Sequence, residues 1–296
     1  MRTSIILILF CIIVPVKAQK KLLLAGSGNN QIMIIDKKSG NIEWSHTIGD
    51  YDKGIECNSI CMTHEKKILY SYKKGVKLID LNHKILWEYP SPQNSEIHSA
   101  SILPNGNFLL AINGTPTRII EIAPDGQTKD SININVDLGN NNPHMQCRQI
   151  RKAKNGNYLI PVLGKSILYE IASDGNIVKT YNIKGGAFSV FEMNNGNLLL
   201  PLGDTHCIQQ IHRKSGKEIS CISQDGLYPY KILFAGELRK LKNGHWMMAN
   251  WSGHNSTSSA PQIIEFDLSG KVYWTLENQK YGNISTFFPI YNNILK

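Results

Sequence analysis

A short pattern, a tight turn followed by a strongly apolar strand, recurs six times along the chain at intervals of 40 to 50 residues. Three copies spell the turn Asn-Gly-Asn, at residues 105–107, 155–157 and 195–197, and a fourth reads Asn-Gly-His at 243–245. Self-similarity at this period, in units of several short strands, is the sequence signature of a β-propeller in which each repeat forms one blade. The six equivalent strand positions are Ala25, Ser71, Ala111, Pro161, Pro201 and Ala249.

Each repeat contains further strands joined by glycine turns, such as Pro124-Asp125-Gly126 in the third copy. Asn-Gly and Asp-Gly between apolar runs predict tight antiparallel hairpins, because these turns need a positive φ that Gly and Asn tolerate. No stretch shows a sustained helical period with capping residues, which argues against an α/β fold. Each unit therefore predicts a four-stranded antiparallel blade, and the fold class is all-β.

The two ends of the chain complement each other. The first copy lacks an opening strand before residue 21, whereas residues 284–290 have the pattern of an opening strand with nothing after it. Joining the two closes the ring and removes two exposed sheet edges. We expect six blades in a single domain over residues 19–296, closed by the C-terminal strand joining the N-terminal blade. A seven-bladed ring is the alternative and would require one of the longer units to be split.

Residues 1–18 have the pattern of a signal peptide. Arg2 is the charged start, residues 5–14 are the apolar run, and residues 16–18 form a small-residue cleavage site. The run is shorter than the roughly 20 residues that span a membrane, and Cys11 lacks the small residues that precede a lipoprotein cysteine. We expect an exported bacterial protein, periplasmic or extracellular, monomeric and without a transmembrane segment.

The formal net charge of +9 is carried by dispersed lysines. Loss of the leader with Arg2 and Lys17 would leave +7. This balance favours acidic partners such as an anionic polysaccharide. Nucleic acid is not an expected partner, since the chain has no basic cluster or known binding motif.

Five cysteines follow the leader, and an odd number excludes complete pairing. Cys207 and Cys221 flank a turn almost symmetrically, so they could cross-link a hairpin. No cysteine or histidine set has zinc spacing, and the others are expected to be buried thiols. The five are Cys57, Cys61, Cys147, Cys207 and Cys221.

Three repeats carry an Asp, a turn and a terminal Trp, at residues 35–44, 79–87 and 266–274. This pattern resembles the blade motif of the pyrroloquinoline-quinone-like propeller repeats, and the Asn-Gly-Asn strands are similar to those of arylsulfotransferase-like propellers. The resemblance implies the fold more than an activity. It implies that Trp44, Trp87 and Trp274 pack between blades. No set of quinone ligands is recognisable, so a quinone cofactor is not expected.

A gapless alignment of the repeats brings five unlike residues to one equivalent position near the mouth of the central channel. A position with a purely structural role would hold similar residues, whereas this mixture is typical of a surface fitted to a ligand. Structural roles remain open, since His98 can hydrogen-bond the backbone and Arg148 can bridge two blades. The five are Asn58, His98, Arg148, Phe188 and Gly236.

Loops and connections on the same face add further candidates. Imidazoles serve as acid, base or metal ligand near neutral pH, Arg148 can clamp a carboxylate or sulfate, and an aromatic ring can stack on a sugar. We predict catalytic roles for His98, His254, Tyr228 and Tyr230. The predicted ligand-binding residues are Asn58, Arg148, Asn113, His144, His206, Trp251 and Glu237, with Asp204, Gln146 and Asn255 nearby.

Three functions are compatible with this pattern. The first is a carbohydrate-binding protein or carbohydrate-active lyase or hydrolase, for a possibly acidic glycan, with a base near the sugar. A divalent metal held by three of the histidines is a variant of it. The second is a non-catalytic protein-interaction scaffold, and the third is a quinone-dependent oxidoreductase.

Overall fold

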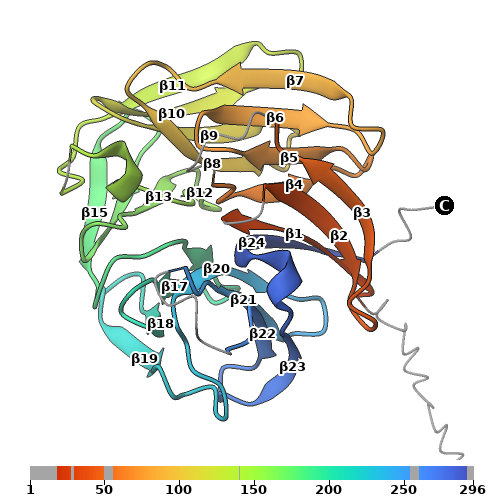
Figure 1. The fold of residues 1–296 in the computed structure, drawn as a ribbon. Helices are drawn as coiled ribbons and strands as arrows, with labels where there is room; N and C mark the ends of the chain where they lie inside the picture. Colours follow the sequence, from red (N-terminus) through yellow and green to blue (C-terminus); the bar gives the residue numbers. More distant parts are fainter. Residues whose placement is uncertain (1–18, 28–29, 50–55, 140, 254–259, 292–296) are drawn as a thin grey trace, which may run out of the picture.

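The computed structural model describes residues 19–27, 30–49, 56–139, 141–253 and 260–291. The predicted signal peptide lies outside the described residues. Across them the chain forms six four-stranded antiparallel sheets arranged around a central axis (Figure 1). The predicted six-bladed propeller is confirmed.

The blades follow one another along the chain, numbered here 1 to 6, with the innermost strand of each given first. Blade 1 is β24 (Asn283–Ile290), β1 (Lys21–Ser27), β2 (Gln31–Asp36) and β3 (Ile42–Thr47). Blade 2 is β4 (Ile60–Met62), β5 (Ile68–Ser71), β6 (Gly75–Ile79) and β7 (Ile85–Pro90). Blade 3 is β8 (Glu96–Ile102), β9 (Phe108–Asn113), β10 (Thr117–Ile122) and β11 (Thr128–Ile134).

The remaining blades repeat this order. Blade 4 is β12 (Arg151–Lys152), β13 (Tyr158–Pro161), β14 (Ile167–Ile171) and β15 (Ile177–Asn182). Blade 5 is β16 (Phe191–Glu192), β17 (Leu198–Leu202), β18 (Cys207–Ile211) and β19 (Glu218–Ile222). Blade 6 is β20 (Ala235–Lys240), β21 (Trp246–Asn250), β22 (Ile263–Phe266) and β23 (Val272–Leu276). Two short 3₁₀ helices, η1 (Pro143–Met145) and η2 (Gln279–Tyr281), lie in connections.

The ring is closed by β24, which pairs antiparallel with β1 from Lys21 opposite Ile290 to Ser27 opposite Asn283. The two strands come from opposite ends of the chain and lie side by side in Figure 1. The predicted closure by the C-terminal strand is therefore confirmed.

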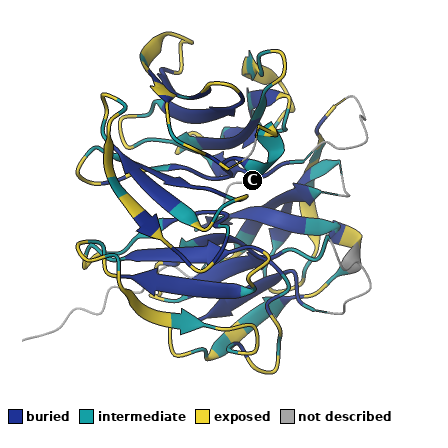
Figure 2. Cartoon of the chain, turned by 90° about the vertical axis from the view of Figure 1, so that its left-hand side faces the viewer, coloured by how far each residue is buried: buried dark blue, intermediate teal, exposed yellow. Residues whose placement is uncertain are grey.

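The core lies between the blades. All six residues of β9 are buried, whereas the outermost strand β3 has only exposed and half-buried positions. Figure 2 shows strands that are buried throughout and others with exposed positions. The Trp44 indole donates to the carbonyl of Leu81 in the next blade over 2.9 Å, and Trp87 packs on Phe108 with ring centroids 5.1 Å apart. These contacts match the expected packing of the motif tryptophans between blades.

The Asn-Gly-Asn turns have a second role besides their positive φ at glycine. In blade 3, the side-chain amides of Asn105 and Asn107 both donate to Glu121 of β10, and Lys152 of blade 4 pairs with the same carboxylate at 2.9 Å. Blade 4 repeats this arrangement with Asn155 and Asn157, and blade 6 has His245 in place of the second asparagine. We call Glu121, Glu170 and Glu265 the interblade carboxylates, whose cationic partners from the next blade are Lys152, Arg213 and Lys37.

The five described cysteines are all free. The possible Cys207–Cys221 cross-link is thus not formed. Cys221 lies opposite Gln209 in the β18–β19 register, which makes it a diagonal neighbour of Cys207, and the two free thiols hydrogen-bond one another. Within the described residues, no helix is long and apolar enough to cross a membrane.

Candidate functional site

Three of the aligned residues meet where the innermost strands begin. Asn58 precedes β4, His98 lies in β8 and Arg148 precedes β12, and all three side chains are buried. Glu96, at the start of β8, and His144, in η1, complete the group. We call Glu96, His98, His144, Arg148 and Asn58 the mouth cluster.

The hydrogen bonds of Asn58 fix the proton position on His98. The Asn58 Oδ1 atom accepts from Ser285 Oγ at 3.0 Å, and its Nδ2 donates to Glu56 at 3.1 Å. The same Nδ2 lies 2.9 Å from Nδ1 of His98, which must then accept. The proton of the neutral ring is therefore on Nε2, which donates to Glu96 Oε2 over 2.6 Å.

His144 is oriented in the same way by Arg148. A guanidinium nitrogen of Arg148 lies 2.9 Å from Nε2 of His144, and a second one donates to the His144 carbonyl. Because arginine can only donate, Nε2 of a neutral His144 accepts, and Nδ1 donates to Glu96 Oε2 at 3.2 Å. One carboxylate oxygen thus receives two imidazole N–H groups, and Lys73 Nζ lies 3.4 Å from the other oxygen.

These contacts determine the charge states. Burial, assisted by the nearby Arg148 charge, lowers the pKa of His98 to about 3, so this ring is neutral at physiological pH. Partial burial opposes ionisation of Glu96, but the hydrogen bonds from His144 and His98 outweigh it and hold the pKa of Glu96 far below its usual range. Burial also lowers the pKa of Arg148, against the attraction of Glu56 and Glu96. The mouth cluster is therefore an ionised carboxylate between two imidazoles, with a buried guanidinium behind it.

Glu96, His98 and His144 also form a group that could hold a metal ion, since their ligand atoms all lie within 4.8 Å of one another. Two histidines and one carboxylate suit a divalent transition metal. In the hydrogen bonding described above, both rings present N–H groups to Glu96 instead of lone pairs. A metal would have to displace those protons, and rotation of the Asn58 amide would bring its oxygen against Glu56.

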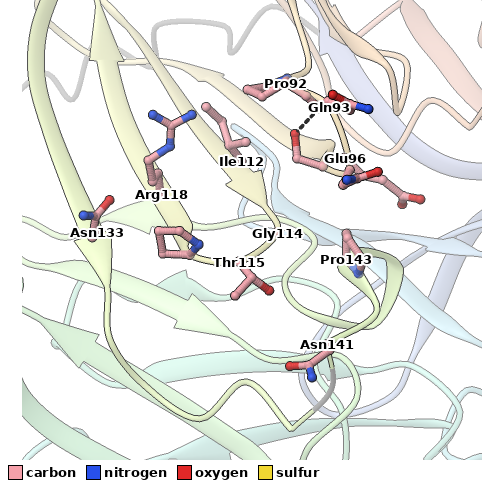
Figure 3. A pocket seen from close by; sticks show the side chains of 13 residues that line it. Pro92, Gln93, Glu96, Ile112, Gly114, Thr115, Arg118, Asn133, Asn141 and Pro143 are labelled. Atoms are coloured by element: carbon pink, nitrogen blue, oxygen red, sulfur yellow. Dashed lines mark hydrogen bonds between the residues drawn. The ribbon is translucent and has the colours of Figure 1, made fainter.

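A polar pocket opens beside the mouth cluster (Figure 3). It has a volume of about 910 Å³, and Glu96 lies at its edge near Pro143. Side-chain amides and one guanidinium dominate its walls, so it offers hydrogen-bond donors and acceptors with little net charge. These polar lining residues are Gln93, Asn94, Arg118, Asn133 and Asn141.

Several predicted ligand-binding residues make hydrogen bonds to the surrounding framework. Asn113 is fully buried and donates to the carbonyls of Pro143 and Cys147, which anchors the loop that carries His144. His206 is bonded to the carbonyl of Leu233 at 2.6 Å. Both side chains thus bond to the backbone of neighbouring loops, and neither hydrogen-bonds a side chain of the mouth cluster in these contacts.

Glu237 and Trp251 link blades. Glu237 is fully buried inside the channel, where it accepts from the Thr286 hydroxyl and the backbone N–H of Phe287. The Trp251 indole donates to Ser27 Oγ of blade 1 at 2.9 Å. None of these three hydrogen bonds involves the mouth cluster.

Tyr228 and Tyr230, predicted as catalytic, line a separate hollow of about 460 Å³ against the outer strand β23. None of its lining residues belongs to the mouth cluster, and Tyr228 is 85% exposed. The structure thus separates these tyrosines from His98. His254 and Asn255 lie outside the described residues.

Glu96 and Glu56 were not predicted, although the sequence carries a signal for them. Each lies two residues before a position of the aligned set, Glu56 before Asn58 and Glu96 before His98. Acidic residues at this common spacing from the aligned set were therefore candidates for the same cluster, although Glu56 and Asn58 both precede β4 and are not placed by strand alternation.

Comparisons with known proteins agree with this fold. The Mal s 1 allergenic protein-like family matches over residues 27–271. A crystal structure of a protein of unknown function from Bacteroides caccae is 36% identical, covers 92% of this chain and 99% of its own, and superposes with a TM-score of 0.86. No curated protein matches the chain.

More distant structures share only the architecture. A catalytically inactive virginiamycin B lyase from Staphylococcus aureus, solved with quinupristin, is 14% identical over 90% of this chain and 87% of its own, with a TM-score of 0.59. The WD40 propeller domain of Doa1 is 11% identical over 77% of this chain and 71% of its own, with a TM-score of 0.57. The comparisons support the β-propeller superfamily, but not the pyrroloquinoline-quinone-like or arylsulfotransferase-like assignment.

Proposed function

The chain belongs to the Mal s 1 allergenic protein-like family, and we propose that it binds a carbohydrate at the channel mouth, with Glu96 as the central acceptor. The observation that carries the proposal is the position of Glu96, an ionised carboxylate held by two imidazoles at the edge of a polar pocket. A ligand rich in hydroxyl groups has the donors that such a carboxylate accepts.

The pocket supports a neutral or mildly acidic sugar. Asn133, Asn141 and Gln93 can each both donate and accept, as sugar hydroxyls do, and Arg118 offers a fork for a carboxylate. The volume of about 910 Å³ is in the range of small-ligand sites, which extends to roughly 1,000 Å³.

The same cluster can support proton transfer in a lyase or hydrolase. The His144 side chain is 31% exposed, and an imidazole next to a carboxylate is a common acid or base. His98 is fully buried and acts on the ligand only through Glu96, so we assign it a positioning role.

Calorimetric titration with neutral and uronic-acid oligosaccharides tests the proposal. We expect binding of one of these sugars. At a ligand concentration of 100 times the Kd, binding should raise the free energy of unfolding, measured by chemical denaturation, by about 2.7 kcal/mol. Glu96→Gln and Arg148→Gln should weaken binding at least tenfold, whereas Glu88→Gln, on the exposed outer strand β7, should not. Absence of binding to every glycan, or equal binding by Glu96→Gln and the unaltered chain, would refute the carbohydrate proposal.

A further inference from the structure

The opposite end of the channel contains a second pocket that shares no residue with the mouth cluster. It has a volume of about 780 Å³ and extends from the turns of blades 2 and 3 into the channel. Its inner end contains Arg151 and Arg239, which follow the aligned positions 148 and 236 by three residues. The two arginines occupy equivalent places in their blades, because Arg151 pairs with Leu159 and Arg239 with Met247, each two residues after its turn.

The inner end of this pocket carries an excess of positive charge. Arg151 and Arg239 share a single carboxylate, that of Glu237, at 3.5 and 2.6 Å from its Oε1 atom. The other carboxylate oxygen is occupied by the Thr286 hydroxyl and the Phe287 N–H. Lys152, also in the wall, is paired with Glu121. Two guanidinium groups therefore face one carboxylate.

Hydrogen bonding at Arg239 is also incomplete. Its Nη2 atom donates to Glu237 and to the carbonyl of Ile60, whereas its Nε–H is buried without a partner. A buried donor without an acceptor costs about 1–3 kcal/mol, and more when the group is charged. A bound anion would add the missing negative charge beside this guanidinium.

The remaining walls are largely apolar. The Arg239 guanidinium lies over the Phe288 ring at 5.1 Å, and the pocket continues outward along aliphatic and aromatic side chains. A ligand that fits must therefore combine an anionic head with an apolar body. These apolar lining residues are Met62, Leu78, Ile102, Phe108 and Phe288.

We propose that this end of the channel binds a small organic carboxylate with an aromatic or short aliphatic body, its carboxylate held by Arg151 and Arg239 and its body by the apolar wall. The site is separate from the carbohydrate site, and either proposal can fail without the other.

Calorimetric titration of the whole protein with benzoate and hexanoate, against benzamide and hexanamide, tests this site. The carboxylates should bind at least tenfold more tightly than the amides, and more tightly than sulfate. Equal affinity for acid and amide, or tighter binding of sulfate, would overturn the proposal.

Two variants locate the site. Arg239→Gln should weaken benzoate binding at least tenfold, whereas Lys129→Gln, which removes one positive charge from the exposed outer strand β11, should leave it unchanged. Met62→Trp narrows the pocket without touching the arginines and should also weaken binding, so the test remains valid if Arg239→Gln unfolds. Benzoate binding that survives in Met62→Trp and in a folded Arg239→Gln would place the ligand elsewhere and refute the assignment.

Discussion

The side-chain amide of Asn58 lies 2.9 Å from Nδ1 of His98, and Glu56 and Ser285 fix which end of that amide faces the ring. Residues of two blades and of the closing strand β24 thus determine which nitrogen of His98 carries the proton. His98 presents Nε2–H to Glu96, and the carboxylate is ionised and oriented before any ligand arrives.

We predict that His98 is the Nε2–H tautomer and that Asn58→Asp adds a second proton at Nδ1. A carboxylate at position 58 accepts where the amide donates, while Glu96 still accepts from Nε2–H, so the ring should become a cation that donates to both carboxylates. Nitrogen-15 chemical shifts of the histidine rings report the tautomer directly. An Nδ1–H signal for His98 in the unaltered protein would contradict the hydrogen-bond assignment.

The depressed pKa of His98 makes stability depend on pH. Between about pH 6.5 and pH 3 the unfolded chain binds a proton at this residue that the native protein excludes, so the free energy of unfolding falls as the pH falls. Between pH 7 and pH 5, this one group should lower the free energy of unfolding by about 2 kcal/mol.

Urea unfolding at both pH values measures this effect. The decrease in the free energy of unfolding from pH 7 to pH 5 should be about 2 kcal/mol smaller in His98→Gln than in the unaltered protein. The decrease should be the same as in the unaltered protein in His64→Gln, whose side chain is exposed. Staying above pH 5 avoids protonation of Glu96, whose contribution to stability is lost only below its ordinary pKa of about 4.3. An unchanged pH dependence in His98→Gln would disprove the prediction.

Ring closure should depend on the side chains of the last strand. Phe287 is fully buried among residues of blades 1 and 6, so Phe287→Ala should lower the free energy of unfolding by about 3–5 kcal/mol. Ile219→Ala, on the outer strand β19 at 48% exposure, should change it by no more than about 0.5 kcal/mol. A similar decrease in the free energy of unfolding in Phe287→Ala and Ile219→Ala would contradict a requirement for β24 in ring closure.

The interblade carboxylates should matter more than exposed ion pairs. Glu170 accepts from Arg213 of blade 5 at 2.6 Å and from two turn amides, and its pKa falls to about 2 because these hydrogen bonds outweigh its burial. Glu170→Ala leaves Arg213 without this partner and should cost about 3–5 kcal/mol. Glu218→Ala breaks the exposed pair with Lys184 and should cost about 0–1 kcal/mol. Chemical denaturation of both variants makes the comparison, and equal costs would contradict it.

The blades could be predicted from the sequence because their determinants are local. Asn-Gly turns specify hairpins, and the repeat sets the period; Gly106 and Gly156 both adopt φ of 87°. Closure followed from one unpaired strand at the end of the chain. The convergence of Asn58, His98 and Arg148 followed from the same alignment, because equivalent strand positions lie at equivalent depths.

Side-chain direction could not be predicted, because β-bulges change it. The pairing of β20 shifts between Ala235 and Leu238, and that of β8 between Ile97 and Ser99. A shift of one residue moves a side chain to the other face. Glu237, next to an aligned position, consequently points into the channel. Tyr228 and Tyr230 lie in a connection whose path toward β23 the repeat does not specify.

The composite nature of blade 1 also has a kinetic consequence. Its innermost strand follows the rest of that blade by more than 200 residues, so β1 has no inner neighbour until nearly the whole chain is present. Contacts between such distant segments slow folding. Completion of the ring should therefore be the late event in folding, and until then the inner edge of β1 is open to any extended segment that reaches it.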